Sequence, residues 1–213
     1  MKLLIVAATS IEINPLLLAF KFDEGSLKIG EHEADILITG VGMVPTAFAM
    51  GQKMAQKQYD LALNLGIAGS FDQDLPIGEV VSVSQDVFAD WGAEDDQDFL
   101  SIDDLGFGDS VQHESYPKYL KKNAGLRQVK GITVNKAHGE EMTIAKTKTR
   151  LKPQVESMEG AAFFYACRQV PINCIQIRAI SNYVERRNRD NWNIGLAVKN
   201  LNRWAIDFLT TSL

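Results

Sequence analysis

The chain has 213 residues, of which 46% are hydrophobic and 23% are charged, and its formal net charge is −5. A chain of this length buries roughly 70% of its unfolded surface, so we expect one domain over residues 1–213 whose core needs no metal or disulfide. The acidic charge argues against a nucleic-acid-binding protein, which would present a basic face, and no apolar run is long enough to span a membrane.

Short apolar runs, several of them rich in Val and Ile, predict strands that are largely buried. The first run begins at Leu3 and covers only a few residues, which predicts a strand and not a signal peptide. The five predicted strands are residues 3–8, 35–40, 61–66, 80–87 and 174–180.

Between and after these strands, apolar residues recur with helical spacing and predict helices at 43–57, 158–170 and 192–209. Strands that alternate with helices indicate a three-layer α/β/α fold with a mixed central sheet. In the first helix the apolar stripe is Ala47, Met50, Gly51 and Met54.

Residues 90–108 are acidic and punctuated by glycine, with the charges clustered between 94 and 98. Such a run predicts a solvated loop. The alternative is a lid or a subunit contact beside a binding site.

Ligands of open α/β sheets bind at the carboxyl ends of strands, and polar or Gly-rich segments lie at four such ends: 9–12, 40–42, 64–70 and 181–182. A carboxylate at the start of the 158–170 helix can bind the two hydroxyls of a ribose, and an amide at the end of the last strand can hydrogen-bond a purine. Together with Glu12, Glu159 and Asn182 predict an enzyme that cleaves a base from a nucleoside.

The order of these motifs resembles the nucleoside phosphorylase and nucleosidase superfamily over almost the whole chain. The methylthioadenosine/S-adenosylhomocysteine nucleosidases are similar in pattern, and Ser-Asn-Tyr-Val-Glu at 181–185 with Arg-Asn-Arg-Asp-Asn-Trp at 187–192 resembles the futalosine hydrolases of the alternative menaquinone route more narrowly. The resemblance implies hydrolysis of the N-glycosidic bond of futalosine, which releases hypoxanthine and dehypoxanthine futalosine. Its shared motifs are the Glu after the first strand, Gly-x-Gly at 40–42, Asn-x-Gly-x-Ala-Gly at 64–69, Leu-Pro-Ile-Gly-Glu-Val-Val at 75–81, Met-Glu at 158–159 and Arg-Ala-Ile-Ser-Asn at 178–182.

The resemblance also implies roles for individual residues. Glu12 would orient and deprotonate the attacking water, although an acidic residue also suits a helix N-terminus. Glu159 would bind the ribose hydroxyls through charge-assisted hydrogen bonds, with Met158 on the sugar face; the alternatives are a Glu paired with Arg178 or a surface Glu. Residues implied to lie around the base are Ala68, Gly69 and Ser181.

Asn182 departs from the adenine-releasing nucleosidases, which carry an Asp there. An amide donates hydrogen bonds but transfers no proton at neutral pH. A hypoxanthine anion spreads its charge onto its 6-oxygen and leaves without that proton, so Asn182 favours a 6-oxopurine nucleoside over methylthioadenosine. The alternative is a strand-end Asn that bonds its own backbone.

Phosphorylases need a cationic site for phosphate, usually built from arginines. This chain has Asn64 where the family places one of them, and Arg178 is expected to make a structural ion pair, so water is the expected nucleophile. Arg186, Arg187 and Arg189 are candidates for binding the carboxylate of the 5′ substituent, with a solvated basic loop as the alternative. Residues with an open role at the pocket are Phe88, Trp91, His138 and Trp192.

Other classes of protein stay open. Gly40 and Gly42, with Asp60 about 20 residues later, match part of a dinucleotide-binding motif, but Pro45 stands where a third Gly is expected. A nucleoside sensor without activity is another alternative, as are a methylthioadenosine nucleosidase and a purine nucleoside phosphorylase. We expect no cofactor, no metal site and no nucleic-acid or membrane partner, and a homodimer or higher homo-oligomer. Neither Cys167 nor Cys174 has zinc or redox spacing, which favours reduced core thiols in a cytoplasmic protein.

Overall fold

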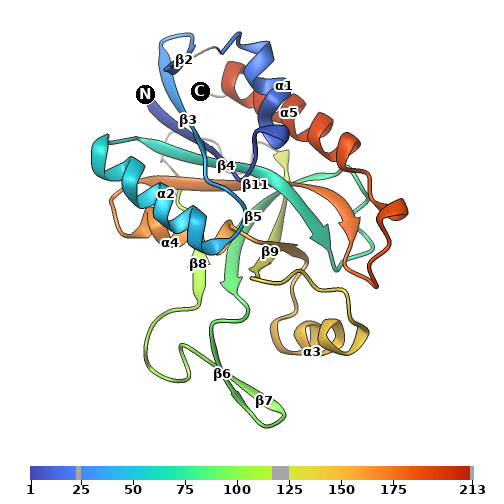
Figure 1. The fold of residues 1–213 in the computed structure, drawn as a ribbon. Helices are drawn as coiled ribbons and strands as arrows, with labels where there is room; N and C mark the ends of the chain where they lie inside the picture. The colour runs from blue at the N-terminus through green and yellow to red at the C-terminus, as the bar shows by residue number, and fades with distance from the viewer. Residues whose placement is uncertain (23–24, 117–124, 212–213) are drawn as a thin grey trace.

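The computed structural model describes residues 1–22, 25–116 and 125–211. It contains a central sheet with helices on both of its faces (Figure 1). The helices are α1 (Ser10–Ala19), α2 (Met43–Gln56), α3 (Glu141–Leu151), α4 (Gly160–Arg168) and α5 (Ile194–Thr211). The strands of the central sheet are β1 (Lys2–Ala7), β2 (Ser26–Ile29), β3 (His32–Ile38), β4 (Leu61–Ser70), β5 (Val80–Phe88), β8 (Val111–His113), β9 (Arg127–Thr133), β10 (Val155–Ser157) and β11 (Asn173–Tyr183).

Across the described residues, the sheet has nine strands in the order β10-β9-β5-β11-β4-β1-β3-β2, with β8 paired to β5. Strands β3, β1, β4 and β11 are mutually parallel neighbours, whereas β5 runs antiparallel to β11. The mixed sheet and its two helical layers confirm the predicted three-layer α/β/α fold. The five predicted strands correspond to β1, β3, β4, β5 and β11.

Strand β1 divides the core, because successive side chains of a strand point to opposite faces of the sheet. Leu3 and Ile5 are buried in the cluster formed with α1 and α5, and Leu4 and Val6 are buried in the cluster formed with α2 and α4. Since helices cover both faces, the strand is apolar from residue 3 to residue 7 instead of alternating with polar residues.

Two predicted helices begin later than expected. The helix predicted for 158–170 is α4, which begins at Gly160 with Glu159 as its N-cap. The helix predicted for 192–209 is α5, which begins at Ile194 after a 3₁₀ turn at Arg189–Asn191. Gly51 was wrongly placed on the buried stripe of α2, because it is exposed whereas Met50 is fully buried.

Helix α1 packs against α5 through buried apolar residues, and the buried side chain of Asn202 adds hydrogen bonds between the two helices. The Asn202 Nδ2 donates to the carbonyl of Glu12 at 2.8 Å, and its Oδ1 accepts from the N–H of Leu16 at 2.9 Å. These two backbone groups lie one helical turn apart. Asn202 therefore fixes the first turns of α1, which carry Glu12.

The acidic segment predicted as a loop contains a β-hairpin of β6 (Gly92–Asp95) and β7 (Asp98–Ser101), which projects from the body of the molecule (Figure 1). The turn is made by Asp96, whose φ of 52° is left-handed. The Arg150 guanidinium lies 4.1 Å from the centre of the Phe99 ring and joins the hairpin to the end of α3.

None of the helices in the described part of the chain has the length and apolar character of a membrane span.

Candidate functional site

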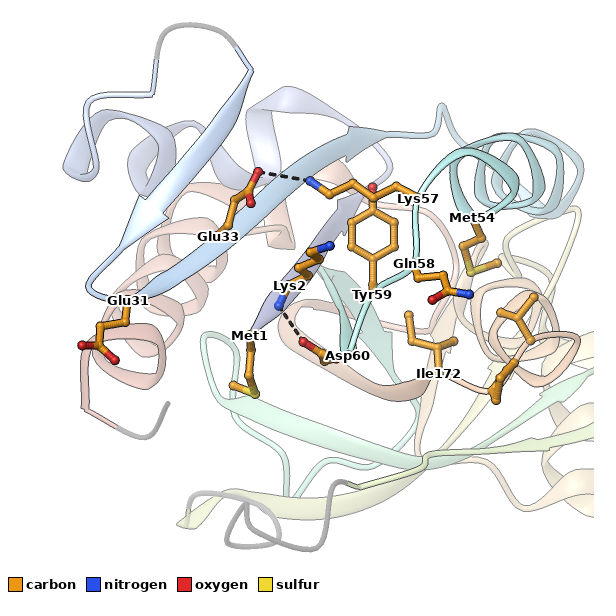
Figure 2. Close-up of a pocket in the computed structure, with 12 residues that line it drawn as sticks. Met1, Lys2, Glu31, Glu33, Met54, Lys57, Gln58, Tyr59, Asp60 and Ile172 are labelled. Carbon is orange, nitrogen blue, oxygen red and sulfur yellow. Dashed lines mark hydrogen bonds and ion pairs between the residues drawn. The ribbon is translucent and has the colours of Figure 1, made fainter.

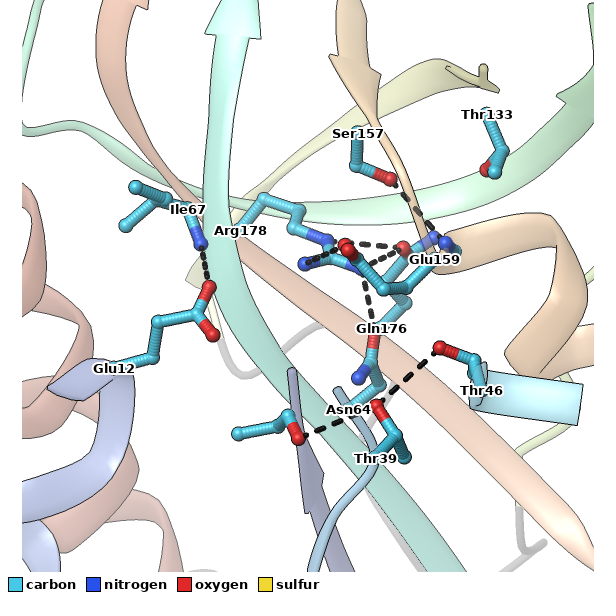
Figure 3. A network of polar contacts seen from close by, with 12 residues as sticks. Glu12, Thr39, Thr46, Asn64, Ile67, Thr133, Ser157, Glu159, Gln176 and Arg178 are labelled. Atoms are coloured by element: carbon cyan, nitrogen blue, oxygen red, sulfur yellow. Dashed lines mark hydrogen bonds and ion pairs between the residues drawn. The ribbon is translucent and has the colours of Figure 1, made fainter. Parts of the chain in front are cut away.

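The parallel strands β1, β4 and β11 end at the same edge of the sheet, and polar side chains gather there (Figure 3). Glu12 follows β1, and Glu159 lies between β10 and α4. Arg178 from β11 lies between them, and Asn182 lies further along the same strand. The segments that the sequence places at strand ends therefore lie at one end of the sheet.

Glu12 is buried and binds two elements at once. Its Oε2 accepts hydrogen bonds from the N–H and the hydroxyl of Thr9, at 2.9 and 3.0 Å, and its Oε1 accepts from the N–H of Ile67 at 3.2 Å. The helix-start role that was the alternative interpretation is thus present, but the bond to β4 adds a second function. It fixes the carboxylate at the strand end, and Oε1 retains acceptor capacity for a further donor.

Glu159 is held by the Gly-x-Gly turn between β3 and α2. Its Oε1 accepts from the N–H of Gly42 at 3.0 Å, and its Oε2 lies 3.8 Å from the Nη1 of Arg178. Gly42 has a φ of 104°, a conformation that glycine adopts without steric cost. The turn that partly matches a dinucleotide-binding motif therefore presents its N–H group to a carboxylate of the protein itself.

The side chain of Arg178 is 1% exposed, and its hydrogen-bond partners are neutral amides. Its Nη2 donates to Asn64 at 2.6 Å, and both its Nε and its Nη2 donate to Gln176, at 3.0 and 2.9 Å. The expected ion pair exists with Glu159, but at 3.8 Å it is a looser contact than these bonds.

Gly66 supplies the space for this guanidinium. A Cβ at that position would lie 2.0 Å from the Nη1 of Arg178 and 3.1 Å from the Oε1 of Glu12. Any larger residue would displace the arginine, so the glycine of the Asn-x-Gly-x-Ala-Gly motif is required by a side chain. Glu12 and Arg178 therefore approach one another at this glycine.

Asp86, on β5, is a buried acid that was not among the site residues predicted from the sequence. Its carboxylate accepts from the Nε2 of Gln176 at 2.9 Å and from the hydroxyl of Thr133 at 2.8 Å. Burial raises its pKa to about 6, against the opposing effects of these two hydrogen bonds and of Arg178. The available signal was a lone charged residue inside an apolar strand, which is rarely buried without a partner.

Asn182 is half-buried after a β-bulge that shifts the register of β11 between Ile180 and Asn182. Its Nδ2 donates to the carbonyl of Tyr183 at 2.9 Å, and its Oδ1 accepts from the hydroxyl of Ser181 at 2.8 Å. The amide has two N–H groups, and the bond to Tyr183 uses one of them. A Cβ on Gly69 would lie 3.1 Å from this Nδ2, so Gly69 leaves room for the amide.

The other predicted pocket residues lie beside these groups. Met158 is half-buried and directly precedes Glu159, and Ala68 is buried with its carbonyl 3.2 Å from the hydroxyl of Ser181. Among the open candidates, Phe88 is buried and meets the half-exposed Trp91 edge to face, with ring centres 5.2 Å apart.

The three arginines after β11 are exposed to solvent. The guanidinium of Arg187 lies 5.1 Å from the centre of the Trp192 ring, a cation–π arrangement. Arg189 begins the 3₁₀ turn that leads into α5. These residues follow Asn182 closely in the chain; all of them, Arg186, Arg187 and Arg189, are more than one-third exposed.

His138 belongs to a polar cluster and is not an exposed loop residue. Its Nδ1 and its backbone N–H both bind the carboxylate of Glu156, and its Nε2 lies 2.9 Å from the hydroxyl of Thr147. Glu156, which lies three residues before Glu159, is thus committed to the histidine. In the described part of the chain, no group of three His, Cys, Asp or Glu residues could hold a metal ion.

A separate cavity of about 730 Å³ opens at the other end of the sheet, where β1 and β4 begin (Figure 2). Several of its charged groups already have partners within the protein. The Nζ of Lys57 lies 3.2 Å from Glu33, and the N–H of Lys2 donates to Asp60 at 2.7 Å. We assign this cavity no role in the chemistry of the site.

Beside this cavity, Asp35 supports strand β3, and replacing it tests that support. Burial opposes ionisation, but hydrogen bonds from Lys53, Lys57, Tyr59 and Ser26 hold the pKa of Asp35 well below its ordinary value. A lowered folded-state pKa stabilises the fold above the unfolded value and loses that effect as the pH falls through the folded one. We expect Asp35→Asn to lower the free energy of unfolding by about 2 kcal/mol at pH 7. In urea denaturation the deficit should shrink below about pH 4; a deficit that does not depend on pH would contradict this.

The comparisons with known proteins agree with one another on the family. The model described as "Phosphorylase superfamily" matches residues 5–210. A futalosine hydrolase of Thermus thermophilus is 30% identical over 176 residues, which cover 78% of this chain and 77% of that protein. A 5′-methylthioadenosine/S-adenosylhomocysteine nucleosidase structure from Helicobacter pylori, with butyl-thio-DADMe-Immucillin-A, has a TM-score of 0.82 at 18% identity and covers 98% of this chain and 97% of its own. A futalosine hydrolase structure from the same organism has a TM-score of 0.81 at 17% identity, with the same coverage. At these identities the two structures show the fold alone and do not separate the two activities.

Proposed function

Since the chain belongs to the phosphorylase superfamily, we propose that it hydrolyses the N-glycosidic bond of futalosine and releases hypoxanthine and dehypoxanthine futalosine. The observation that carries the choice of substrate is the amide of Asn182, where an adenine-releasing enzyme needs an acid. The relative that is 30% identical and carries the name futalosine hydrolase supports the same choice. The methylthioadenosine nucleosidase stays the alternative.

In this proposal the two carboxylates have different tasks. Glu159 binds the ribose hydroxyls, because its Oε1 is fixed by Gly42 and its carboxylate faces the same edge of the sheet as Glu12. Glu12 accepts a proton from a water molecule as the water oxygen bonds to the anomeric carbon. Both negative charges stabilise the positive charge that develops on the sugar as its bond to the purine breaks.

The purine leaves as an anion whose charge is shared by its ring nitrogens and 6-oxygen. The N–H of Asn182 that is not bonded to Tyr183 is available to donate to this anion. The bulge before Asn182 turns its side chain relative to the regular strand, as bulges near active sites often do. The amide thus assists departure without transferring a proton.

Water is preferred over phosphate because, among the residues that the structure describes, the groups near Glu12 offer no vacant cationic site. Asn64 is 1% exposed, and its amide donates to the carbonyl of Val6 at 3.2 Å and accepts from Arg178. Two of the three side-chain nitrogens of Arg178 donate hydrogen bonds to Asn64 and Gln176. A phosphate dianion would require more positive charge than one committed guanidinium supplies.

The experiment that tests this function incubates the purified protein with futalosine, inosine and methylthioadenosine in phosphate-free buffer and identifies the purine released. Hypoxanthine from futalosine, at a rate unchanged by added phosphate, is the expected result. Dependence on phosphate would identify a phosphorylase. Faster release of adenine from methylthioadenosine would overturn the substrate.

The 5′ substituent of futalosine ends in an aromatic carboxylate, and an arginine of the loop after Asn182 is proposed to bind it. Arg187 is the first choice, since its contact with Trp192 orders the side chain. Arg187→Ala should raise the KM for futalosine about tenfold, because a charge-assisted hydrogen bond contributes about 1.5–3 kcal/mol. The KM for inosine, which lacks the carboxylate, should hardly change. Equal changes for both substrates, in this variant and in the matched Arg186→Ala and Arg189→Ala variants, would refute the assignment.

An exposed apolar patch beside the site supports a homodimer. Val41, Val44 and Phe48 are 54%, 76% and 66% exposed, and they lie on the turn and the first turns of α2, next to the Gly42 that binds Glu159. A second copy covering this patch would close the rim of the site. Sedimentation should give twice the chain mass, and Phe48→Glu should give monomers; a wild-type monomer at micromolar concentration would disprove the dimer.

We also propose a cytoplasmic location, consistent with the free thiols of Cys167 and Cys174.

A further inference from the structure

A line of buried polar side chains extends from the ribose-binding carboxylate into the core. Asp86, Gln176 and Arg178 are each at most 1% exposed, and Glu159 is 6% exposed. Hydrogen bonds run from Arg178 to the Oε1 of Gln176, and from the Nε2 of Gln176 to Asp86. Buried charged groups are costly unless they are paired and hydrogen-bonded, so this line of side chains calls for an explanation.

The amide of Gln176 has one allowed orientation. A guanidinium only donates, so the Gln176 oxygen must face Arg178, and its N–H₂ must then face the Asp86 carboxylate. Gly160, at the start of α4, leaves the room for this arrangement. A Cβ there would lie 2.0 Å from the Oε1 of Gln176 and 2.1 Å from the Oδ2 of Asp86.

Two negative groups compete for the charge of Arg178. On one side Glu159 lies 3.8 Å from Nη1, and on the other side Asp86 acts through the polarised amide of Gln176. The charged groups that face Asp86 are Arg178, which lowers the pKa of Asp86, and Glu159, which raises it. Burial raises the pKa of Asp86 to about 6, while the hydrogen bonds from Gln176 and Thr133 favour its charged form.

Gln176 holds the Nε edge of the guanidinium, and without it only the Nη2 bond to Asn64 would keep Arg178 from turning toward Glu159. Arginine and carboxylate groups favour a bidentate pair at about 2.7–2.9 Å, whereas the observed separation is 3.8 Å. Such a pair would occupy the oxygens that ribose hydroxyls need. The fixed Nε and Nη2 bonds prevent it.

We propose that Asp86 and Gln176 are positioning residues that hold Arg178 back from Glu159 and so keep the Glu159 carboxylate available to the ribose hydroxyls. The inference rests on the proposed nucleoside chemistry. It adds two residues, on β5 and β11, that contact no substrate and act through Arg178.

The test compares inosine with 2′-deoxyinosine as competitive inhibitors of futalosine hydrolysis. Wild-type enzyme should bind inosine more tightly, because only inosine offers the 2′-hydroxyl to Glu159. In Asp86→Asn and Gln176→Leu the inhibition constant of 2′-deoxyinosine divided by that of inosine should fall about tenfold, the effect of losing about 1.4 kcal/mol. A purely structural role would weaken both nucleosides equally.

Gln112→Leu is the matched control, since Gln112 is a buried amide opposite Asp86 on β8 that bonds only to the carbonyl of Asp109 among its described contacts. Its ratio should equal that of wild type. Asp86→Asn keeps the shape of the side chain and decides the matter if Gln176→Leu does not fold; an unchanged ratio in folded Asp86→Asn overturns the inference. Absence of futalosine turnover by wild type would count against the proposed function instead, and the ratio would then be measured by equilibrium binding of the same two nucleosides.

Discussion

Glu12→Gln should lower the kcat of futalosine hydrolysis by about 10³-fold and leave KM nearly unchanged. General-base catalysis contributes about 10²–10⁴-fold, and an amide cannot accept the proton of the attacking water. The substitution is isosteric and keeps one acceptor oxygen for Thr9 or Ile67. The expected loss of stability is therefore small, about 1 kcal/mol for a disturbed helix start, and a decrease in rate would report chemistry.

Thr9→Val is the control for the helix-start contribution of Glu12. It removes the hydroxyl that donates to the Oε2 of Glu12 at 3.0 Å but keeps the carboxylate and the backbone bond from the Thr9 N–H. Its kcat should stay within about tenfold of wild type. If Glu12→Gln retained comparable activity while unfolding at the wild-type temperature, Glu12 would be a structural residue and another base would have to be sought.

The location of the site was predictable because it depends on strand order and direction. Glu12, Glu159 and Asn182 follow or border apolar runs, and parallel strands bring their carboxyl ends to one edge. The three residues are thus placed near one another by topology that the alternation of strands and helices already indicates. Their chemical roles remain proposals that rest on family resemblance and on the geometry described above.

The interior of the site was not predictable in the same way. Asp86 and Gln176 lie inside runs that predict buried strands, and each residue alone only suggests that some partner exists. Only the sheet order shows that β5 lies beside β11, and only the register shows that Gln176 lies opposite Val83. No spacing within one segment contains this information.

Short and irregular elements were missed for related reasons. Strand β10 has three residues and gains its pairing from β9 and β4, so it has no local period. Helix α3 is mostly exposed, and only Thr147 is buried. In the acidic hairpin, composition correctly predicts exposure but does not predict that β6 and β7 pair around Asp96.

Asn182→Asp should increase the release of adenine from methylthioadenosine about 10²-fold, the lower range of general-acid catalysis. In the structure the Nδ2 of Asn182 lies 2.9 Å from the carbonyl oxygen of Tyr183, and Ser181 donates to the Oδ1. An aspartate oxygen in the place of that nitrogen would face a carbonyl oxygen, and this contact favours the protonated acid over the carboxylate. The protonated acid would then transfer its proton to the imidazole ring of adenine as the bond to the ribose breaks.

Hydrolysis of futalosine by the same variant should change far less, because hypoxanthine departs as an anion with only a hydrogen-bond donor beside it. Asn182→Ala is the matched control: it removes the donor without adding an acid, so release of hypoxanthine should fall about tenfold, in line with a hydrogen bond of about 1.5 kcal/mol to a charged group, and adenine release should not rise. The measurement is kcat/KM for both nucleosides in wild type and the two variants. If Asp at 182 leaves the preference for hypoxanthine over adenine unchanged in a folded enzyme, the amide does not select the leaving group, and specificity must come from contacts to the 5′ substituent instead.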